Sequence, residues 1–95
     1  MDNVQLSGFR EIDESTMVMV QKLVQNHMHR INELAEKIDL VHITCKLVHE
    51  REKSEKYEVH ANVKDNGKVF ASKVTDRNLL AALDSVLNKI IHEMD

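Results

Sequence analysis

Six histidines and one cysteine are the side chains of this sequence best suited to chemistry, as metal ligands or as general bases and nucleophiles. Their spacing does not favour a metal. His27 and His29 lie two residues apart in a segment with helical periodicity, so their side chains point to different sides. His42 and His60 are candidate neighbours on a sheet, whereas a zinc site needs three or four convergent ligands. We predict neither a metal site nor any other cofactor.

Covalent and acid–base catalysis are no better supported. Cys45 alternates with apolar residues along a strand-like segment, which indicates a buried structural thiol. Asp84 lies between apolar residues of the last helical segment, and we expect it to hydrogen-bond a nearby turn. The sequence contains no glycine-rich phosphate loop and no nucleophile elbow. We therefore predict that the protein is not an enzyme and takes no small-molecule substrate.

The basic side chains form the third candidate group. The formal net charge is −3, from 13 Lys and Arg against 16 Asp and Glu, which disfavours indiscriminate binding to nucleic acid but allows a local basic face. Two sets are expected. The open face of a sheet should carry Lys46, Lys64, Lys73, His42 and His60, with Arg51, Lys53 and Lys56 in a hairpin, and the helices should carry Lys22, Arg30, Lys37, Lys89 and His92. Glutamates are interleaved with both sets, so an ordinary mixed-charge surface is the alternative.

Two segments, residues 15–38 and 79–94, have the periodicity of amphipathic helices, with apolar side chains recurring at i, i+3 and i+4. His27 falls on the apolar stripe of the first segment, so we expect it at the border of the core or inside it. Polar residues that favour the N-cap position precede each segment. The expected N-caps are Asp13 or Ser15 for the first helix and Thr75 or Asp76 for the second.

Four segments are predicted to be strands. They are residues 3–9, 40–50, 57–64 and 68–74. Within the first of these segments, the strand is expected to end at Gly8. In residues 40–50 the side chains of Val41, Ile43, Cys45 and Leu47 fall on one side and alternate with more polar neighbours. Residues 50–56 (EREKSEK) are expected to form a charged hairpin connection. Residues 65–67 (DNG) predict a type I′ turn, because Asn and Gly tolerate the positive φ that this turn requires.

The predicted order β-α-β-β-β-α defines an α+β two-layer sandwich, in which a four-stranded sheet carries two helices on one face and leaves the other open to water. The double-stranded RNA-binding domain has an analogous plan. Residues 1–95 are expected to form a single domain. A single cysteine suggests a reducing compartment, and no apolar run is long enough to cross a bilayer. We predict a cytoplasmic protein that does not bind membranes and is a monomer or a weak homodimer.

Three stretches of this sequence resemble the ribosome hibernation-promoting factor family, also called the ribosome-associated inhibitor or sigma-54 modulation protein family. The first is VQLSGF, which looks like the first strand of the family, and the second is EKIDLVHITCKL, which looks like its passage from first helix to second strand. The third is VHANVKDNGKVFASKVTDRNLLAALDSVLNKI, which is similar to its closing hairpin and helix. The likeness spans almost the whole chain and corresponds to the short form of the family.

This resemblance implies a protein that docks in the decoding channel of the small ribosomal subunit, contacts rRNA, blocks the mRNA and tRNA sites and silences translation. The rRNA-binding residues implied by position are Lys89, Arg30, Lys37, Lys46, His92 and His27. This chain departs from the family in its acidic balance and in the ending IHEMD, where the family has a lysine-rich continuation. Both departures weaken the expected grip on phosphates.

A divergent protein of the same fold that binds a protein partner or double-stranded RNA is the alternative function. One geometric criterion separates the two. Docking on the ribosome through the implied residues requires Arg30, Lys37, Lys46 and Lys89 to form one contiguous cationic patch. Interruption of that patch by Glu33, Glu36 and Glu93 favours a protein partner.

Overall fold

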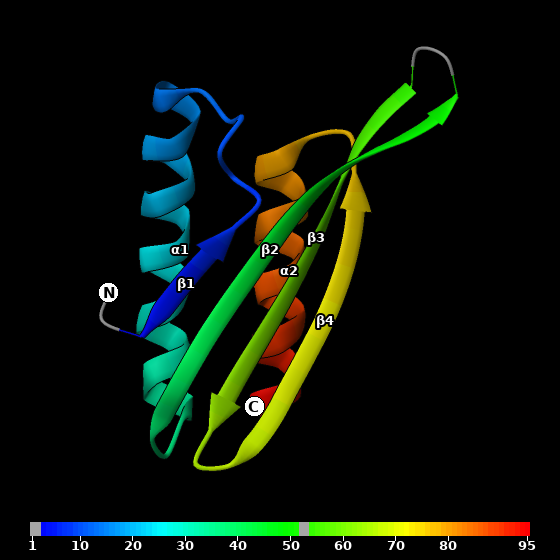
Figure 1. The fold of residues 1–95 in the computed structure, drawn as a ribbon. Coiled ribbons are helices and arrows are strands. Elements are labelled where there is room, and N and C mark those ends of the chain that lie inside the picture. The colour runs from blue at the N-terminus through cyan, green and yellow to red at the C-terminus, as the bar shows by residue number, and fades with distance from the viewer. Residues whose placement is uncertain (1–2, 52–53) are drawn as a thin grey trace.

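The computed structural model describes residues 3–51 and 54–95. The elements are β1 (Val4–Ser7), α1 (Glu14–Leu34), β2 (Ile38–Arg51), β3 (Ser54–Asp65), β4 (Lys68–Asp76) and α2 (Leu79–Met94). The strands form one sheet in the order β1-β2-β3-β4, with β1 parallel to β2 and the other neighbours antiparallel. Both helices lie against the same face of this sheet (Figure 1). The predicted α+β sandwich and its element order are therefore confirmed.

The hydrophobic core lies between the sheet and the two helices. Along β2, the buried side chains of Val41, Ile43 and Cys45 alternate with more exposed neighbours, as the period of two predicts. Strand β3 contributes buried residues with the same alternation. The helices close the core with Val20, Val24, Ile31, Leu83, Val86, Leu87 and Ile90, all fully buried. Burial of these apolar faces is the main force that holds the two layers together.

The end of α1 corrects one prediction. The helix ends at Leu34 and not at residue 38. The buried carboxylate of Asp65 accepts hydrogen bonds from the backbone N–H of Glu36 at 3.0 Å and of Lys37 at 2.7 Å, and the chain becomes extended. Ile38 keeps the apolar spacing of the helix but reaches the core as the first residue of β2. The apolar period therefore continued past the true end of the helix.

The predicted N-cap is correct for α1 and wrong for α2. Asp13 caps α1 as predicted, because its carboxylate accepts a hydrogen bond from the backbone N–H of Thr16 at 3.2 Å. The cap of α2 is Asn78, which accepts from the N–H of Ala81 at 3.0 Å. The prediction of Thr75 or Asp76 is wrong, because both residues pair with β3 as the last part of β4.

The connection between β2 and β3 is shorter than predicted. Strand β2 continues to Arg51 and β3 begins at Ser54, so most of the segment 50–56 is hairpin strand, while positions 52–53 lie outside the described residues. This arm extends beyond the helices (Figure 1). Leu47 shares the inward side with Cys45 but is 43% exposed. Leu47 therefore lies beyond the part of β2 that is buried under the helices.

Two backbone positions need glycine or a close substitute. Asn66 and Gly67 have φ of 50° and 86°, which confirms the predicted type I′ turn between β3 and β4. Gly8 has φ of 82°, and a Cβ atom there would lie 2.0 Å from the carbonyl oxygen of Cys45. Gly8 therefore allows β1 to leave the sheet directly beside β2. Within the described part of the chain, neither helix is long and apolar enough to span a bilayer.

Candidate nucleic-acid interface

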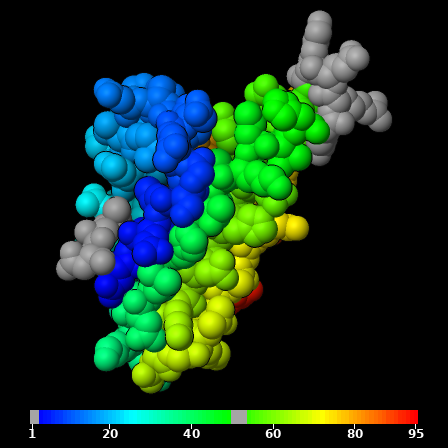
Figure 2. Space-filling view, in the orientation of Figure 1, coloured from blue at the N-terminus to red at the C-terminus, as the bar shows by residue number. Residues whose placement is uncertain are grey.

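The open face of the sheet, the one that no helix covers, carries side chains from all four strands. Its cross-strand rows are Ser7–Thr44–His60–Lys73, Gln5–His42–Asn62–Ala71, Lys46–Glu58–Thr75, Leu40–Lys64–Val69 and Val48–Lys56. Figure 2 views the molecule from this side and shows β2, β3 and β4 side by side without a covering helix. The prediction that Lys46, Lys64 and Lys73 share the open face with His42 and His60 is confirmed.

The charge of this face is unlike that of the whole chain. Among its described residues, four lysines stand against one glutamate, a net +3 within a chain of net −3. Lys46, Lys64 and Lys73 are exposed, and none of them forms an ion pair with another residue that the structure describes. A local basic face of this kind creates an attractive field for polyanions even when the net charge is negative.

Glu58 is the single carboxylate among the described residues of the open face, and cations surround it. His60 Nε2 lies 2.7 Å from its Oε1, Lys46 stands directly opposite on β2, and Lys73 is close on β4. The hydrogen bond from His60 is the main cause that lowers the pKa of Glu58, and the charges of His60, Lys73 and Lys46 act in the same direction. Glu58 therefore stays ionised and holds the imidazole of His60 in place.

His42 is held by a different partner. Its Nε2 lies 2.8 Å from the hydroxyl oxygen of Ser7 on β1, and its cross-strand neighbours are Gln5 and Asn62. Both open-face histidines thus use Nε2 within the protein. Their Nδ1 atoms make no hydrogen bond with a described residue and can face a ligand.

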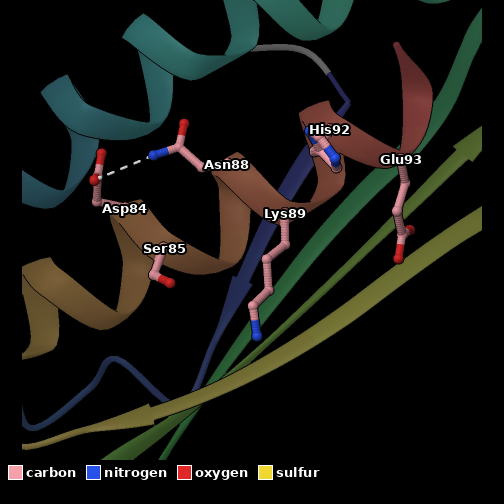
Figure 3. A pocket seen from close by; sticks show the side chains of 6 residues that line it. All are labelled: Asp84, Ser85, Asn88, Lys89, His92 and Glu93. Atoms are coloured by element: carbon pink, nitrogen blue, oxygen red, sulfur yellow. Dashed lines mark hydrogen bonds between the residues drawn. The ribbon is translucent and has the colours of Figure 1, made fainter.

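The helix layer holds the second set of predicted contacts. Lys89 and His92 lie on the polar side of α2, where a shallow groove of about 570 Å³ is lined by Asp84, Ser85, Asn88, Lys89, His92 and Glu93 (Figure 3). Lys89 is exposed and stands one turn from Glu93. Acidic and basic groups alternate along this groove, so it lacks the net positive charge of the open face.

His27 and Arg30 lie beside carboxylates within the helix layer. The Nδ1 of His27 donates to the carbonyl oxygen of Leu23 at 2.9 Å, and its Nε2 lies 3.1 Å from Oδ1 of Asp84. Asp84 therefore joins α2 to α1, and the prediction that it serves a nearby turn is wrong. Arg30 lies 3.6 Å from a carboxylate oxygen of Asp95 and 3.8 Å from one of Glu33.

The predicted rRNA contacts are therefore divided between two sides of the molecule. Lys46 points away from the helices, on the open face, whereas Lys89, His92, Arg30 and His27 belong to the helix layer. Lys37 lies neither in the sheet nor in a helix. It follows α1 in the connection to β2, where its backbone N–H binds Asp65. The single contiguous patch of Arg30, Lys37, Lys46 and Lys89 required by our geometric criterion is absent.

Sequence reasoning missed the role of Asp65. Asp65 binds the connection after α1, and the next two residues join the β3–β4 turn to the same connection. Asn66 N–H donates to the carbonyl of Lys37 at 2.8 Å, and Gly67 N–H donates to Asp39 at 3.1 Å. The turn between β3 and β4 is thereby fixed to the end of α1. Asp in a DNG turn signals only the turn itself, so no local pattern could have revealed this contact.

In the described part of the chain, no three His, Cys, Asp or Glu side chains converge as metal ligands.

A four-stranded β-α-β-β-β-α sandwich with one basic open face belongs to the class of small α+β folds. No family model matches the sequence, and no curated protein matches it. Several solved structures are similar to it, among them these two. A ribosomal subunit interface protein from Coxiella burnetii has a TM-score of 0.69 and 18% identity, over 97% of this chain and 92% of that one. The N-terminal domain of Protein Y from Thermus thermophilus has a TM-score of 0.69 and 14% identity, over 96% and 91%.

Both neighbours are hibernation-promoting factor proteins, so the predicted resemblance is confirmed as a likeness of fold.

Proposed function

We propose that this protein associates with the ribosome in the cytoplasm, docks on the small subunit and silences translation by covering the mRNA and tRNA sites. The observation that carries this proposal is the likeness of fold, over nearly the whole chain, to a protein known as a ribosomal subunit interface protein. The function is one of binding and not of catalysis. No small-molecule substrate and no cofactor enter it.

The proposed contacts to rRNA combine the helix layer with the open face. Because these residues do not form the single patch required above, docking would need rRNA on two sides of the protein, as the walls of a channel provide. Lys89, Arg30 and Lys37 would neutralise phosphates beside the helices, together with His92 and His27, and Lys46 would do so from the sheet. The charge distribution supports a role for Lys46 despite the acidic total, because four lysines stand against one glutamate among the described residues of the open face. Arg30 would have to exchange Asp95 for a phosphate, since these two groups are 3.6 Å apart in the free protein.

Co-sedimentation with purified small ribosomal subunits, across a salt series from about 50 to 200 mM, tests the association. We expect saturable binding that weakens as salt rises. Lys89→Glu combined with Arg30→Glu should weaken it, whereas the control Arg10→Glu with Lys22→Glu, an equal charge change at exposed positions outside the proposed contacts, should retain most of it. Addition of the protein to a translation reaction should then inhibit synthesis in proportion to subunit occupancy. Absence of saturable binding at the lowest salt would refute the proposal.

A further inference from the structure

The open face of the sheet combines exposed cations with two histidines that each retain a free ring nitrogen. We infer that this face binds the phosphate backbone of double-stranded RNA, and that its positive charge grows as His42 and His60 take up protons. The inference deepens the proposed function and rests on it for its biological setting, because rRNA is the RNA that such a protein would meet. The binding surface itself follows from the residues of the sheet.

The lysines are spread over the face rather than gathered at one point. Neighbouring strands lie about 4.8 Å apart and residues rise about 3.3 Å along a strand, so Lys46 and Lys73 are separated by about two strand spacings and one row, and Lys64 lies about 13 Å along β3 from His60. Lysine adds a flexible stem to each of these positions. Such an array can follow a line of phosphates, whereas a compact anion would contact only one of them.

Aromatic side chains are missing from the described rows of the open face. Phe9 is buried, and Tyr57 and Phe70 stand in inward rows and pack against the core. Proteins that read single-stranded RNA stack its bases on exposed rings, while double-stranded RNA is bound through its shape and its phosphates. Apart from the rings of His42 and His60, which are hydrogen-bonded to Ser7 and Glu58, the open face offers only the second kind of contact. This selects a duplex as the ligand and predicts little dependence on sequence.

The two histidines add a pH response to this surface. His60 faces Glu58 at 2.7 Å, Lys73 across to β4 and Thr44 across to β2, while His42 faces Ser7, Gln5 and Asn62. Histidine is the side chain whose charge ordinarily changes between pH 5 and 8. Protonation of both rings would raise the net charge of the described open face from +3 to +5 and would leave each Nδ1–H able to donate to a phosphate.

Fluorescence anisotropy with a labelled RNA duplex of about 16 base pairs, the length that a double-stranded RNA-binding domain spans, tests the surface directly. The sheet variant is Lys46→Gln with Lys64→Gln and Lys73→Gln. Its matched control is Arg10→Gln with Lys22→Gln and Arg77→Gln, three exposed cations outside the open face and outside the proposed rRNA contacts. Each phosphate contact contributes about 0.7–0.9 to the slope of log affinity against log salt, so the sheet variant should lose about two units of slope and on the order of 100-fold affinity at physiological salt. The control variant should stay within about threefold of wild type.

The pH response has its own matched pair. Between pH 8 and pH 6, binding of the duplex by the wild type should tighten by about tenfold, consistent with two added contacts. His42→Gln with His60→Gln should abolish most of this change. His29→Gln with His49→Gln removes two exposed histidines outside the open face and should leave it intact. Urea midpoints of all variants, measured alongside, separate loss of binding from loss of fold.

The outcomes for the two proposals are distinguishable. If the wild type does not bind the duplex at 50 mM salt and pH 6, or if the sheet variant binds it as well as the wild type, the open face is not an RNA surface. Small subunits that still bind the wild type would then leave the ribosomal proposal standing. Conversely, duplex binding that depends on the sheet, together with no binding to small subunits, would support the RNA surface and overturn the ribosomal role. A pH response that survives loss of His42 and His60 would refute the histidine part.

Discussion

Replacing Asp65 with alanine removes the acceptor that joins the β3–β4 turn to the end of α1. Its carboxylate, only 8% exposed, accepts from two backbone N–H groups, those of Glu36 and Lys37, and both would be left without this partner. An unsatisfied buried donor costs about 1–3 kcal/mol. Glu36 and Lys37 themselves are exposed, so water can reach part of the turn. We therefore expect Asp65→Ala to lower the free energy of unfolding by about 2–3 kcal/mol, near the lower end of the range for two unsatisfied donors.

Urea unfolding followed by circular dichroism measures this change. Small proteins have m values of about 1–3 kcal/mol per molar urea, so the midpoint should fall by about 1–2 M. Asp65→Asn keeps Oδ1, which accepts from both N–H groups, but puts an amide donor in place of Oδ2 beside the N–H of Glu36, and it should lose about half as much. The matched control is Asp39→Ala, which removes an exposed carboxylate that accepts one N–H from Gly67 in the same pair of turns.

The stability cost of Asp39→Ala is the reference against which the cost of Asp65→Ala is compared. Asp39→Ala should cost about 0.5–1 kcal/mol, because its hydrogen bond is exposed to solvent. If Asp65→Ala costs no more than Asp39→Ala, the buried carboxylate does not hold the two turns together, and another contact must end α1. A lower m value without a change in midpoint would point instead to a more compact denatured state.

Three further predictions concern single positions. Gly8→Ala should lower the free energy of unfolding by about 2–3 kcal/mol, seen as a lower urea midpoint, because a Cβ atom meets the carbonyl of Cys45 and φ is positive there. Burial raises the pKa of the Cys45 thiol, so a thiol reagent such as DTNB should label native protein far more slowly than urea-unfolded protein at pH 8. The lowered pKa of Glu58 stabilises the fold above the ordinary pKa of a glutamate, and this contribution disappears as pH falls through the lower, folded value. Glu58→Gln should remove that acid-range slope of stability, and an unchanged slope would contradict it.

The sheet and its turn were predictable because their signals are local. Alternation in residues 40–50 and 57–64 fixed which side chains face the helices, and Asn66 with Gly67 fixed the type I′ turn. The same alternation is sufficient to place Lys46 and Lys64 on the open face. A period of two leaves each side chain only two directions, so the assignment is nearly complete once the inward side is identified.

The helix boundaries and the pairing of charges were not predictable, because both depend on residues distant in the chain. The end of α1 is set by a carboxylate on β3, and the cap of α2 by how far β4 extends along its partner. His27 and Asp84 meet only because the two helices pack side by side. Sequence spacing could place His27 at the border of the core, but not identify the acid it faces.

An acidic protein with one basic face should bind RNA differently from a protein that is basic all over. Its 13 cationic residues are outnumbered by 16 acidic ones, so the total charge does not attract RNA, and a free duplex gains most from phosphate neutralisation when it approaches the open face. The salt dependence of duplex binding should then report the few lysines of that face and not the total number of cations. A slope near −2 to −3 is expected from Lys46, Lys64 and Lys73. A much steeper slope, equal in the sheet variant and in its matched control, would mean that charge is shared around the molecule and that the separation of faces has no part in binding.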